Sequence, residues 1–398
     1  MTARPVKAAV CRSFGGPLQI EELSVRAPGP GEVGVRVAAC AVCHSDVAFI
    51  EGAWGGALPT VFGHEAAGVV EEVGPGVSGL AAGDHVVVTL IRSCGRCGNC
   101  RWGQPALCDG LPPAGHEGVL ADGDGKPVHQ GMHTAAFSHR VTVHESQAVA
   151  VSPDISLEVA SLLACGVLTG VGAVLNTAAV EAGSTVVVLG AGGVGLNCVQ
   201  GARLAGAGQI IAADLVAAKL DAARAFGATD VIDAAARDSR GEVDRLTAGH
   251  GAGYVFVAAG AVSLIETGMT MLRRGGTLVI VGIPAAGAAV CLDPVAIADG
   301  SLRVLGSKMG ASRPHEDIPR LVRLYQAGLL KLDELISERY EFGRINDAIG
   351  AARAGGQLRP VIVFGGGDEH GSPAPAHGNR QAPAPAGGSG RAARAGPR

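Results

Sequence analysis

The chain has 398 residues, of which 47% are hydrophobic and 17% charged, so it is long enough for two domains with a sizeable core. A formal net charge of −4 and a pI near 6.3 argue against nucleic acid or an anionic membrane surface as the main partner. The first residues contain no apolar run of signal-peptide length, so we expect the ten cysteines to be reduced in a cytoplasmic protein.

Residues 1–150 alternate short valine-rich runs with glycine and proline turns, as in GEVGVRVAAC, HEAAGVVEEVGPGV and GDHVVV. Short runs at such close and irregular spacing predict β-strands. The first part of the chain is therefore expected to form a β-rich, barrel-like unit.

Four cysteines lie close together in the pattern C-x2-C-x2-C-x7-C: Cys94, Cys97, Cys100 and Cys108. Four thiolates within one loop suit one tetrahedral zinc, and such a site leaves no open position for a substrate. The spacing therefore predicts a structural zinc lobe over residues 90–110. A pair of disulfides is the alternative, but nothing else in the sequence indicates export.

A long stretch, Val159–Val180, carries no charged residue and has the length of a membrane span. It is rich in glycine and alanine and contains polar side chains, among them Ser161 and Asn176. We therefore expect a buried helix packed against a sheet, with a membrane span as the disfavoured alternative.

Beyond Glu181 the pattern changes to alternating strands and helices. Strands are predicted in STVVVLG, QIIAADL, DVIDA, YVFVAAG and TLVIVGI, with helices between them that include AAKLDAARAFGA and a helix near Val243–Ala248. Buried, non-alternating strands separated by helices indicate a doubly wound parallel sheet.

The segment GAGGVG follows the first of these strands and opens a helix, and this context strengthens an otherwise weak G-x-G-x-x-G match. Its glycines would let pyrophosphate approach backbone N–H groups closely. Asp214 ends the next strand, where its carboxylate would bind the adenosine ribose and repel a 2′-phosphate, which favours NAD over NADP. Lys219 would support the ribose or simply be a solvated helix charge. The predicted cofactor-binding residues of this region are Gly190, Gly192, Gly193, Val194, Gly195, Asp214 and Lys219.

The last part of the chain contains a predicted helix in IPRLVRLYQAGLL and a closing run, LRPVIVF, that is expected to return to the first unit. Residues 365–398 consist mainly of Gly, Ala, Pro, Ser and Arg without periodic apolar residues, which predicts a disordered tail. A basic nucleic-acid-binding arm is the alternative, but the arginines are few and no aromatic residues lie among them.

Three further residues could form a second, open zinc site: Cys43 in AVCHSD, His64 in FGHEAAG and Cys165 in ACGVLTG. Spacing alone does not establish that they meet, because a buried cysteine or a core histidine explains each one singly. Their order around a four-cysteine lobe, ahead of a nucleotide-binding segment, favours a common function.

With these motifs the chain resembles the zinc-dependent alcohol dehydrogenases of the medium-chain dehydrogenase/reductase superfamily, in the liver-type and formaldehyde-oxidising branch. The resemblance rests on C-H-S-D at 43–46, G-H-E at 63–65, the cysteine lobe, C-G-V-L-T-G at 165–170 and G-A-G-G-V-G with Asp214. It implies an α/β fold in which a GroES-like catalytic domain (1–155) precedes a Rossmann NAD-binding domain (156–305). A return segment (306–364) completes the catalytic domain, and the tail (365–398) lies outside the resemblance.

The resemblance also implies a role for each site residue. Cys43, His64 and Cys165 would bind a catalytic zinc with one position open for the substrate oxygen, and this zinc would lower the pKa of the alcohol. Ser45 would receive the alcohol proton. Four further positions match family residues: Asp46 as the partner that orients His64, Glu65 as a carboxylate near the metal, and His44 and Arg359 as contacts of the cofactor phosphates.

The chain departs from the family pattern at several positions. Ala48 stands where liver-type relatives have a histidine that completes the proton relay. Trp54 and Leu90 fall at positions that line the pocket in relatives, and an apolar pocket favours aromatic or medium-chain aliphatic alcohols. The segment DGLPPAG lacks the arginine with which glutathione-linked formaldehyde dehydrogenases hold their thiol.

The sequence therefore predicts a zinc-dependent, NAD-linked alcohol dehydrogenase that acts on primary alcohols or aldehydes, with two zinc ions per chain. A thiol-dependent formaldehyde dehydrogenase, with mycothiol or glutathione, is the alternative enzyme. A non-catalytic nucleotide-binding protein of the same fold is the alternative from another class. The resemblance further implies a homo-oligomer formed near Leu278–Leu305, with neither nucleic acid nor membrane as a partner.

Overall fold

The structure is a computed structural model that describes residues 3–111 and 118–365. Residues 366–398, for which the sequence predicts a disordered tail, lie outside the described residues, as does most of the segment DGLPPAG.

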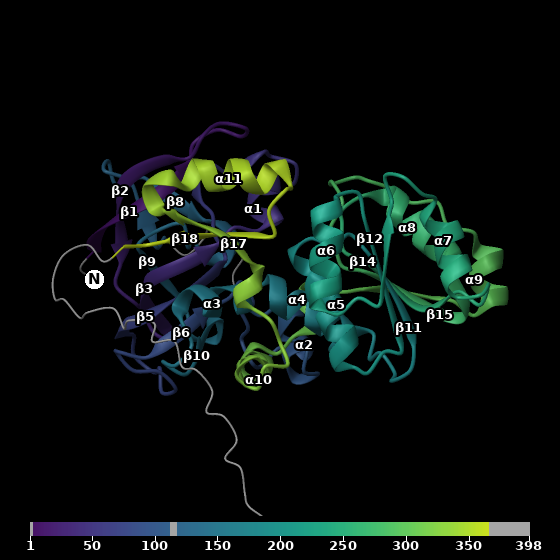
Figure 1. Ribbon diagram of the computed structural model, residues 1–398. Helices are drawn as coiled ribbons and strands as arrows, with labels where there is room; N and C mark the ends of the chain where they lie inside the picture. Colours follow the sequence, from purple (N-terminus) through teal and green to yellow (C-terminus); the bar gives the residue numbers. More distant parts are fainter. Residues whose placement is uncertain (1–2, 112–117, 366–398) are drawn as a thin grey trace, which may run out of the picture. The chain divides into compact units, whose positions relative to one another are not determined.

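Two β-sheets are built mainly from the first part of the chain (Figure 1). A closed barrel has the order β1-β2-β7-β8-β4, and a second sheet has the order β10-β6-β5-β3-β18-β17, with β9 also paired to β3. Their strands are β1 Ala3–Cys11, β2 Gln19–Arg26, β3 Glu32–Ala41, β4 Thr60–Val61, β5 Glu65–Val73, β6 His85–Val88, β7 Leu120–Ala121, β8 Pro127–Gln130, β9 Arg140–His144, β10 Ala148–Ala150, β17 Ile336–Glu341 and β18 Arg359–Val363.

Side-chain alternation explains why the valine-rich runs form these sheets. In β3, Val33, Val35 and Val37 are buried while Arg36 is exposed, so one face of the strand packs into the core. Gly68 in the paired strand β5 has no room for a side chain, because a Cβ there would collide with the Arg36 carbonyl.

A six-stranded parallel sheet follows, in the order β13-β12-β11-β14-β15-β16. Its strands are β11 Thr185–Leu189, β12 Gln209–Asp214, β13 Asp230–Asp233, β14 Ala252–Val257, β15 Leu272–Ile280 and β16 Arg303–Gly306. The order reverses at β11, between β12 and β14, and such a switch point is where open α/β sheets bind nucleotides. The predicted fold class, a GroES-like β-rich unit with a Rossmann sheet, is confirmed.

Helices cover both faces of the parallel sheet (Figure 1). Val186 and Val188 of β11 pack in one buried cluster with α5 and α6, whereas Val187 and Leu189 pack in another with α7 and α8. The helices are α1 His44–Ile50, α2 Gly98–Arg101, α3 Leu157–Ser161, α4 Gly166–Gly172, α5 Gly193–Leu204, α6 Ala217–Phe226, α7 Ser239–Leu246, α8 Val262–Thr270, α9 Pro294–Gly300, α10 Pro314–Gln326 and α11 Ile345–Ala354.

Two predicted helices begin earlier than the sequence suggested. The helix expected near Val243–Ala248 is α7, Ser239–Leu246, because the Asp238 side chain accepts hydrogen bonds from the amides of Arg240 and Gly241 and so caps its start. The helix expected in IPRLVRLYQAGLL is α10, which begins at Pro314 and ends at Gln326. Proline suits the first turn of a helix, where no amide donor is needed.

The apolar run that predicts one buried helix is instead broken at Cys165. Cys165 has φ −144° and ψ −69°, which no helix tolerates, and it separates a short turn at Leu162–Ala164 from α4. No single helix in the described ranges is long and apolar enough to cross a membrane. One pair bent by 50°, Leu157–Ala164 with Gly166–Thr177, meets that criterion by length and composition.

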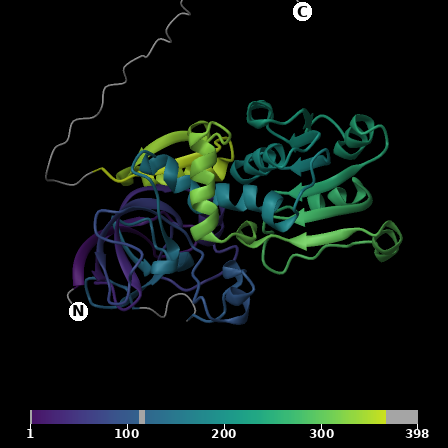
Figure 2. The ribbon, with the colours of Figure 1, turned by 90° about the horizontal axis from the view of Figure 1, so that it is seen from below.

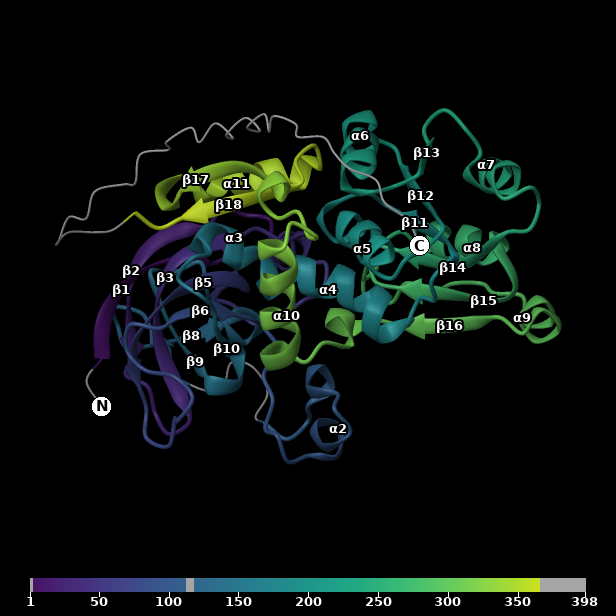
Figure 3. The ribbon, with the colours of Figure 1, turned by 60° about the horizontal axis from the view of Figure 1, so that its bottom comes forward.

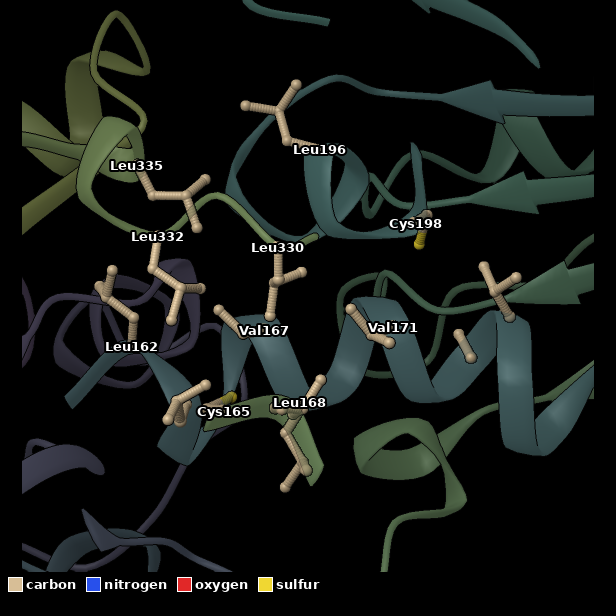
Figure 4. Close-up of a cluster of buried hydrophobic side chains, with 14 of the residues drawn as sticks. Leu162, Cys165, Val167, Leu168, Val171, Leu196, Cys198, Leu330, Leu332 and Leu335 are labelled. Carbon is tan, nitrogen blue, oxygen red and sulfur yellow. The ribbon is translucent and has the colours of Figure 1, made fainter. Parts of the chain in front are cut away.

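The largest buried cluster is continuous from the N-terminal sheets to the parallel sheet. Figure 4 shows α4 beside α5 and the chain around Leu330–Leu335. Gly170 allows α4 to approach α5 closely, since a Cβ there would lie 2.9 Å from the Asn197 backbone. The closing strand β18 pairs antiparallel with β3, and Figure 2 shows these yellow and purple strands side by side.

Candidate active site

Two clusters of metal-ligating side chains occur in the described residues. In the buried cluster, one ligand atom from each of Cys43, His64, Glu65 and Cys165 lies within 4.8 Å of the others. The second cluster consists of Cys94, Cys97, Cys100 and Cys108. The structure thus brings together the residues that the sequence predicted for each zinc.

Asp46 holds two members of the buried cluster in place. Cys43 precedes α1, and its backbone N–H donates to Asp46 Oδ2 at 2.9 Å. Asp46 Oδ1 accepts from the Gly63 N–H at 3.0 Å and lies 3.1 Å from His64 Nδ1. A carboxylate on Nδ1 fixes the ring so that Nε2 is left for a metal.

The break in the helix positions Cys165. The Thr89 hydroxyl donates to the Ala164 carbonyl at 2.7 Å, which occupies an acceptor freed by the break. The Cys165 sulfur then lies 3.7 Å from the Met309 sulfur and 3.9 Å from the Thr169 hydroxyl. A backbone conformation that departs from the helix therefore turns this thiol into the site.

The buried cluster fits a zinc ion. His64 Nε2 is fully buried and has no hydrogen-bond partner among the described residues. A hydrogen bond from the Cys165 thiol, together with nearby His64 and Arg359, holds the pKa of Cys43 well below its ordinary value. Burial opposes charge on His64, but Asp46 and Cys43 outweigh it and hold the pKa of His64 well above its usual range. Two sulfurs and one imidazole around a charged, dry site form a donor set typical of catalytic zinc.

Glu65 and Arg359 form a buried ion pair beside this cluster, with Glu65 Oε1 and Arg359 Nη2 3.3 Å apart. Complete burial raises the pKa of Glu65 to about 8, although Arg359 opposes the rise. The guanidinium also donates to the Val42 carbonyl at 3.3 Å. It lies against Gly166 and Gly193, where any Cβ would collide with it or press on it. Arg359 therefore reaches from the metal cluster to the first residue of α5.

Ser45 and His44 occupy the first turn of α1, next to Cys43. The half-buried Ser45 hydroxyl lies 3.7 Å from the Cys43 sulfur, near enough to the cluster to meet a bound alcohol. His44 is exposed. Ala48, one turn further, is buried with 7% of its surface exposed.

The four cysteines of the lobe that contains α2 (Figure 3) also lie close enough together to hold one metal ion. The Cys97 and Cys108 sulfurs lie 3.9 Å apart, close to the roughly 3.8 Å that tetrahedral Zn–S bonds of about 2.3 Å would give. The backbone N–H of Cys97 donates to the Cys94 sulfur at 3.3 Å. This bond and one from the Arg96 N–H lower the pKa of Cys94 to about 6, whereas burial raises the pKa of Cys100 to about 12.

Two glycines of the nucleotide-binding segment, Gly190 and Gly195, are required by backbone conformation or close packing. Gly190 has φ 94°, in the left-handed region, and a Cβ on Gly195 would collide with its carbonyl. Gly192 caps α5 and faces open space, as a pyrophosphate site requires. Val194 follows in the first turn of α5 and is half-buried.

Asp214 ends β12 and holds the chain on both sides of the switch point. Its Oδ2 accepts from the Ala191 N–H at 2.7 Å, and its Oδ1 accepts from the Val216 N–H at 3.0 Å. Lys219 lies half-buried in the first turn of α6.

Sequence reasoning missed three neighbours of the buried cluster. Thr89, Thr169 and Met309 contact Cys165 or the carbonyl before it, yet the sequence pattern predicted a site role for none of them. Thr169 stands four residues after Cys165 within ACGVLTG, a spacing that places both on one helix face. No sequence signal points to Met309, which approaches from a distant turn with φ 52°.

Two family models match the chain. Residues 29–153 match the alcohol dehydrogenase GroES-like domain, and residues 193–327 match the zinc-binding dehydrogenase family. Together they cover both the buried cluster's N-terminal ligands and the nucleotide-binding helix.

Characterised relatives match over nearly their whole length. An NDMA-dependent alcohol dehydrogenase of Amycolatopsis methanolica is 38% identical, over 90% of this chain and 98% of the relative. An S-(hydroxymethyl)glutathione dehydrogenase of Paracoccus denitrificans is 34% identical, over 90% and 99%. The crystal structure of benzyl alcohol dehydrogenase from Acinetobacter calcoaceticus aligns with a TM-score of 0.85 at 33% identity, over 91% of this chain and 99% of that structure.

Proposed function

This chain belongs to the zinc-dependent alcohol dehydrogenases of the medium-chain dehydrogenase/reductase superfamily, and we propose that it transfers a hydride between primary alcohols or aldehydes and NAD. The observation that carries the proposal is the buried cluster of Cys43, His64 and Cys165 with an unpartnered His64 Nε2. Arg359 lies beside this cluster, where it pairs with Glu65, and it also contacts Gly193 at the start of the nucleotide-binding helix.

In the proposed mechanism, Cys43, His64 and Cys165 hold a zinc ion that, when bound, supplies the Lewis acidity needed to deprotonate an alcohol near neutral pH. Ser45 accepts the alcohol proton at its hydroxyl oxygen and passes its own proton outward. Asp46 keeps His64 in the orientation that this donor set needs. Arg359 and His44 receive the cofactor phosphates, and the glycines at 190–195 allow their close approach.

NAD is the proposed dinucleotide because Asp214 stands where the adenosine ribose would bind. A carboxylate there accepts hydrogen bonds from ribose hydroxyls and repels a 2′-phosphate. Lys219, half-buried in the following helix, would add a donor on the same side.

The proposed substrates are aromatic or medium-chain aliphatic primary alcohols. Trp54 and Leu90 provide apolar walls at the positions expected to line the pocket, and apolar walls select for apolar alcohols. The similar structure from Acinetobacter calcoaceticus is a benzyl alcohol dehydrogenase, which agrees with this choice.

A thiol-dependent formaldehyde dehydrogenase is the second candidate. Its support is the 34% identity to an S-(hydroxymethyl)glutathione dehydrogenase, and against it stands the absence of arginine from DGLPPAG. A non-catalytic nucleotide-binding role is disfavoured because such a protein has no reason to retain the three ligands together with Ser45.

The deciding experiment measures zinc content and NADH production on protein purified without chelator. About two zinc ions per chain and thiol-independent oxidation of benzyl alcohol and hexanol are expected. Formaldehyde oxidation that requires glutathione or mycothiol would move the function to the second candidate. One zinc and no turnover would favour the non-catalytic role.

We also propose a cytoplasmic homo-oligomer, a catalytic domain at 1–155 and 306–364, and a Rossmann domain at 156–305. The domain limits are supported by the division of strands among the sheets. The oligomer is supported by β16, an edge strand of the parallel sheet, and by exposed apolar side chains near it, Ile283, Val295 and Val304.

A further inference from the structure

The loop that follows α1 is shaped to present Trp54. Gly52, Gly55 and Gly56 have φ of 78°, 68° and 129°, conformations that side chains disfavour. A Cβ on Gly52 would also lie 2.9 Å from the Phe14 ring. Three glycines therefore allow the loop to adopt the backbone conformation that surrounds this one large aromatic side chain.

The Trp54 ring rests on the helix that carries the proposed proton acceptor. It meets the Phe49 ring edge-on, with centroids 5.0 Å apart and planes at 87°, and Phe49 stacks on Phe62 at 5.7 Å. Phe49 lies one turn after Ser45 on α1, and Phe62 lies two residues before His64. Trp54 is thus packed onto the elements that hold the buried cluster.

The other end of Trp54 is bound to the parallel-sheet part of the chain. Its indole Nε1–H donates to the Pro284 carbonyl at 3.2 Å. Pro284 follows β15, beyond a tight turn in which the amides of Val281 and Gly282 donate to the Val257 carbonyl at 3.0 and 2.8 Å. The acceptor of the Trp54 hydrogen bond therefore lies just past the carboxyl end of a sheet strand.

Close backbone packing connects this turn to the nucleotide-binding segment. A Cβ on Gly260 would lie 2.6 Å from the Ile283 carbonyl oxygen, and a Cβ on Gly282 would lie 2.6 Å from the Ala259 carbonyl carbon. A Cβ on Gly190 would in turn lie 3.1 Å from the Ala259 side chain. These close approaches form a continuous path of packed backbone from Gly190 through Ala259 and Ile283 to Pro284.

We propose that Trp54 is a positioning residue that couples dinucleotide binding at the carboxyl ends of β11 and β14 to the placement of α1 and its Ser45. The inference rests on the proposed function in one respect: the bound ligand is a nicotinamide dinucleotide. Trp54 acts through the Pro284 hydrogen bond and the Phe49 contact, and it takes no part in bond making.

The chain holds two tryptophans, so the idea can be tested optically. Trp102 is 78% exposed in the cysteine lobe, whereas Trp54 is partly buried. In Trp102→Phe, which leaves Trp54 as the single emitter, saturating NAD⁺ is expected to reduce acrylamide quenching about twofold. The matched control, Trp54→Phe, leaves Trp102 as the emitter and is expected to show no change.

The same Trp54→Phe variant tests the hydrogen bond, because phenylalanine keeps an aromatic ring beside Phe49 and has no N–H donor for the Pro284 carbonyl. We expect NAD⁺ binding by calorimetry to weaken about three- to tenfold, as for the loss of one hydrogen bond. The KM for NAD⁺ should rise by a similar factor, whereas kcat for benzyl alcohol should fall by a smaller factor. Without nucleotide, the amides of Val281 and Gly282 should exchange with deuterium three- to tenfold faster.

Unchanged quenching of Trp54 at saturating NAD⁺, together with parent-like binding and exchange in Trp54→Phe, would overturn the proposal. If neither NAD⁺ nor NADP⁺ binds the parent, the proposed function and the coupling both fail. In that case, faster amide exchange of Val281 and Gly282 in Trp54→Phe would show only that the hydrogen bond from Trp54 to Pro284 orders this turn. If the variant unfolds, the quenching experiment on Trp102→Phe decides alone.

Discussion

At the scale of single residues, Asp46 is the side chain on which the buried cluster most depends. Its two oxygens contact the backbone N–H groups of Cys43 and Gly63 and the ring of His64. Asp46 itself is fully buried. A neutral amide could satisfy at most part of this set, because its nitrogen is itself a donor.

Asp46→Asn is therefore expected to weaken zinc binding at the open site about 10- to 100-fold, the usual cost of losing a partner of a metal-binding histidine. Zinc remaining after dialysis against graded chelator should fall toward one ion per chain. Asp347→Asn, an exposed change on α11, serves as the control. Equal zinc retention in the two variants would contradict the role given to Asp46.

Asp214 is the residue that we propose sets the preference for the dinucleotide. In Asp214→Ser, the ratio of kcat/KM for NADP⁺ to that for NAD⁺ is expected to rise about 10- to 100-fold, because the repulsion of a 2′-phosphate is removed. Asp214 also accepts hydrogen bonds from two backbone N–H groups, so the variant will be less stable. The ratio is measured because a loss of stability affects the activity with both dinucleotides alike. Asp221→Ser, exposed on α6, is the matched control. A ratio unchanged from the parent would remove Asp214 as the determinant.

At the scale of elements, a half-buried carboxylate closes the connection between β2 and β3. Glu32 accepts hydrogen bonds from Arg26 at 2.6 and 3.0 Å and from the Gly29 N–H at 2.8 Å. Burial raises the pKa of Glu32, but the bonds from Arg26 and Gly29 more than offset it and hold this pKa below its ordinary value. A depressed carboxyl pKa stabilises the fold above the unfolded-state pKa, and this contribution is lost as the pH falls through the folded-state pKa.

Glu32→Gln should accordingly lower the free energy of unfolding by about 1–2 kcal/mol at pH 7. The difference from the parent should begin to shrink as the pH falls below the ordinary glutamate pKa of about 4.3. It should vanish once the pH has fallen through the lowered pKa of Glu32 in the fold. Urea unfolding at several pH values measures it. Glu72→Gln, which breaks an exposed pair with Arg4, should change stability by less than about 0.5 kcal/mol at any pH. A pH-independent loss in Glu32→Gln would point to packing instead of charge.

At the scale of the whole molecule, the unpaired edge of the parallel sheet is the surface through which the proposed oligomer would form. β16 pairs with β15 on one side, and its Val304 is 37% exposed on an edge strand. An unpaired strand edge with apolar neighbours favours pairing with a second copy.

Val304→Lys is expected to shift the protein toward monomers in light scattering at micromolar concentration, because a charge on the edge opposes strand pairing. Val73→Lys, at an equally exposed valine at the end of β5, should leave the mass unchanged. A parent that is already monomeric would refute the oligomer itself.

The sequence by itself determined the fold class, the members of the two ligand clusters and the glycine-rich turn that opens α5. These are local patterns: ligand spacing within one loop, glycines at a strand-to-helix turn, and strands whose hydrophobic runs need no distant partner to be recognised. The boundaries of α7 and α10 were less accurate, because the Asp238 cap and a proline at the first position of α10, Pro314, outweigh the apolar pattern.

Only the tertiary structure decided how distant segments meet. The break at Cys165 depends on Thr89 and Met309, which approach from other parts of the chain, and no periodicity could reveal it. The hydrogen bond from Trp54 to Pro284 joins residues 230 positions apart through a backbone carbonyl, a group that every residue carries. Such contacts are set by the packing of whole elements, and a backbone acceptor leaves no mark in the sequence.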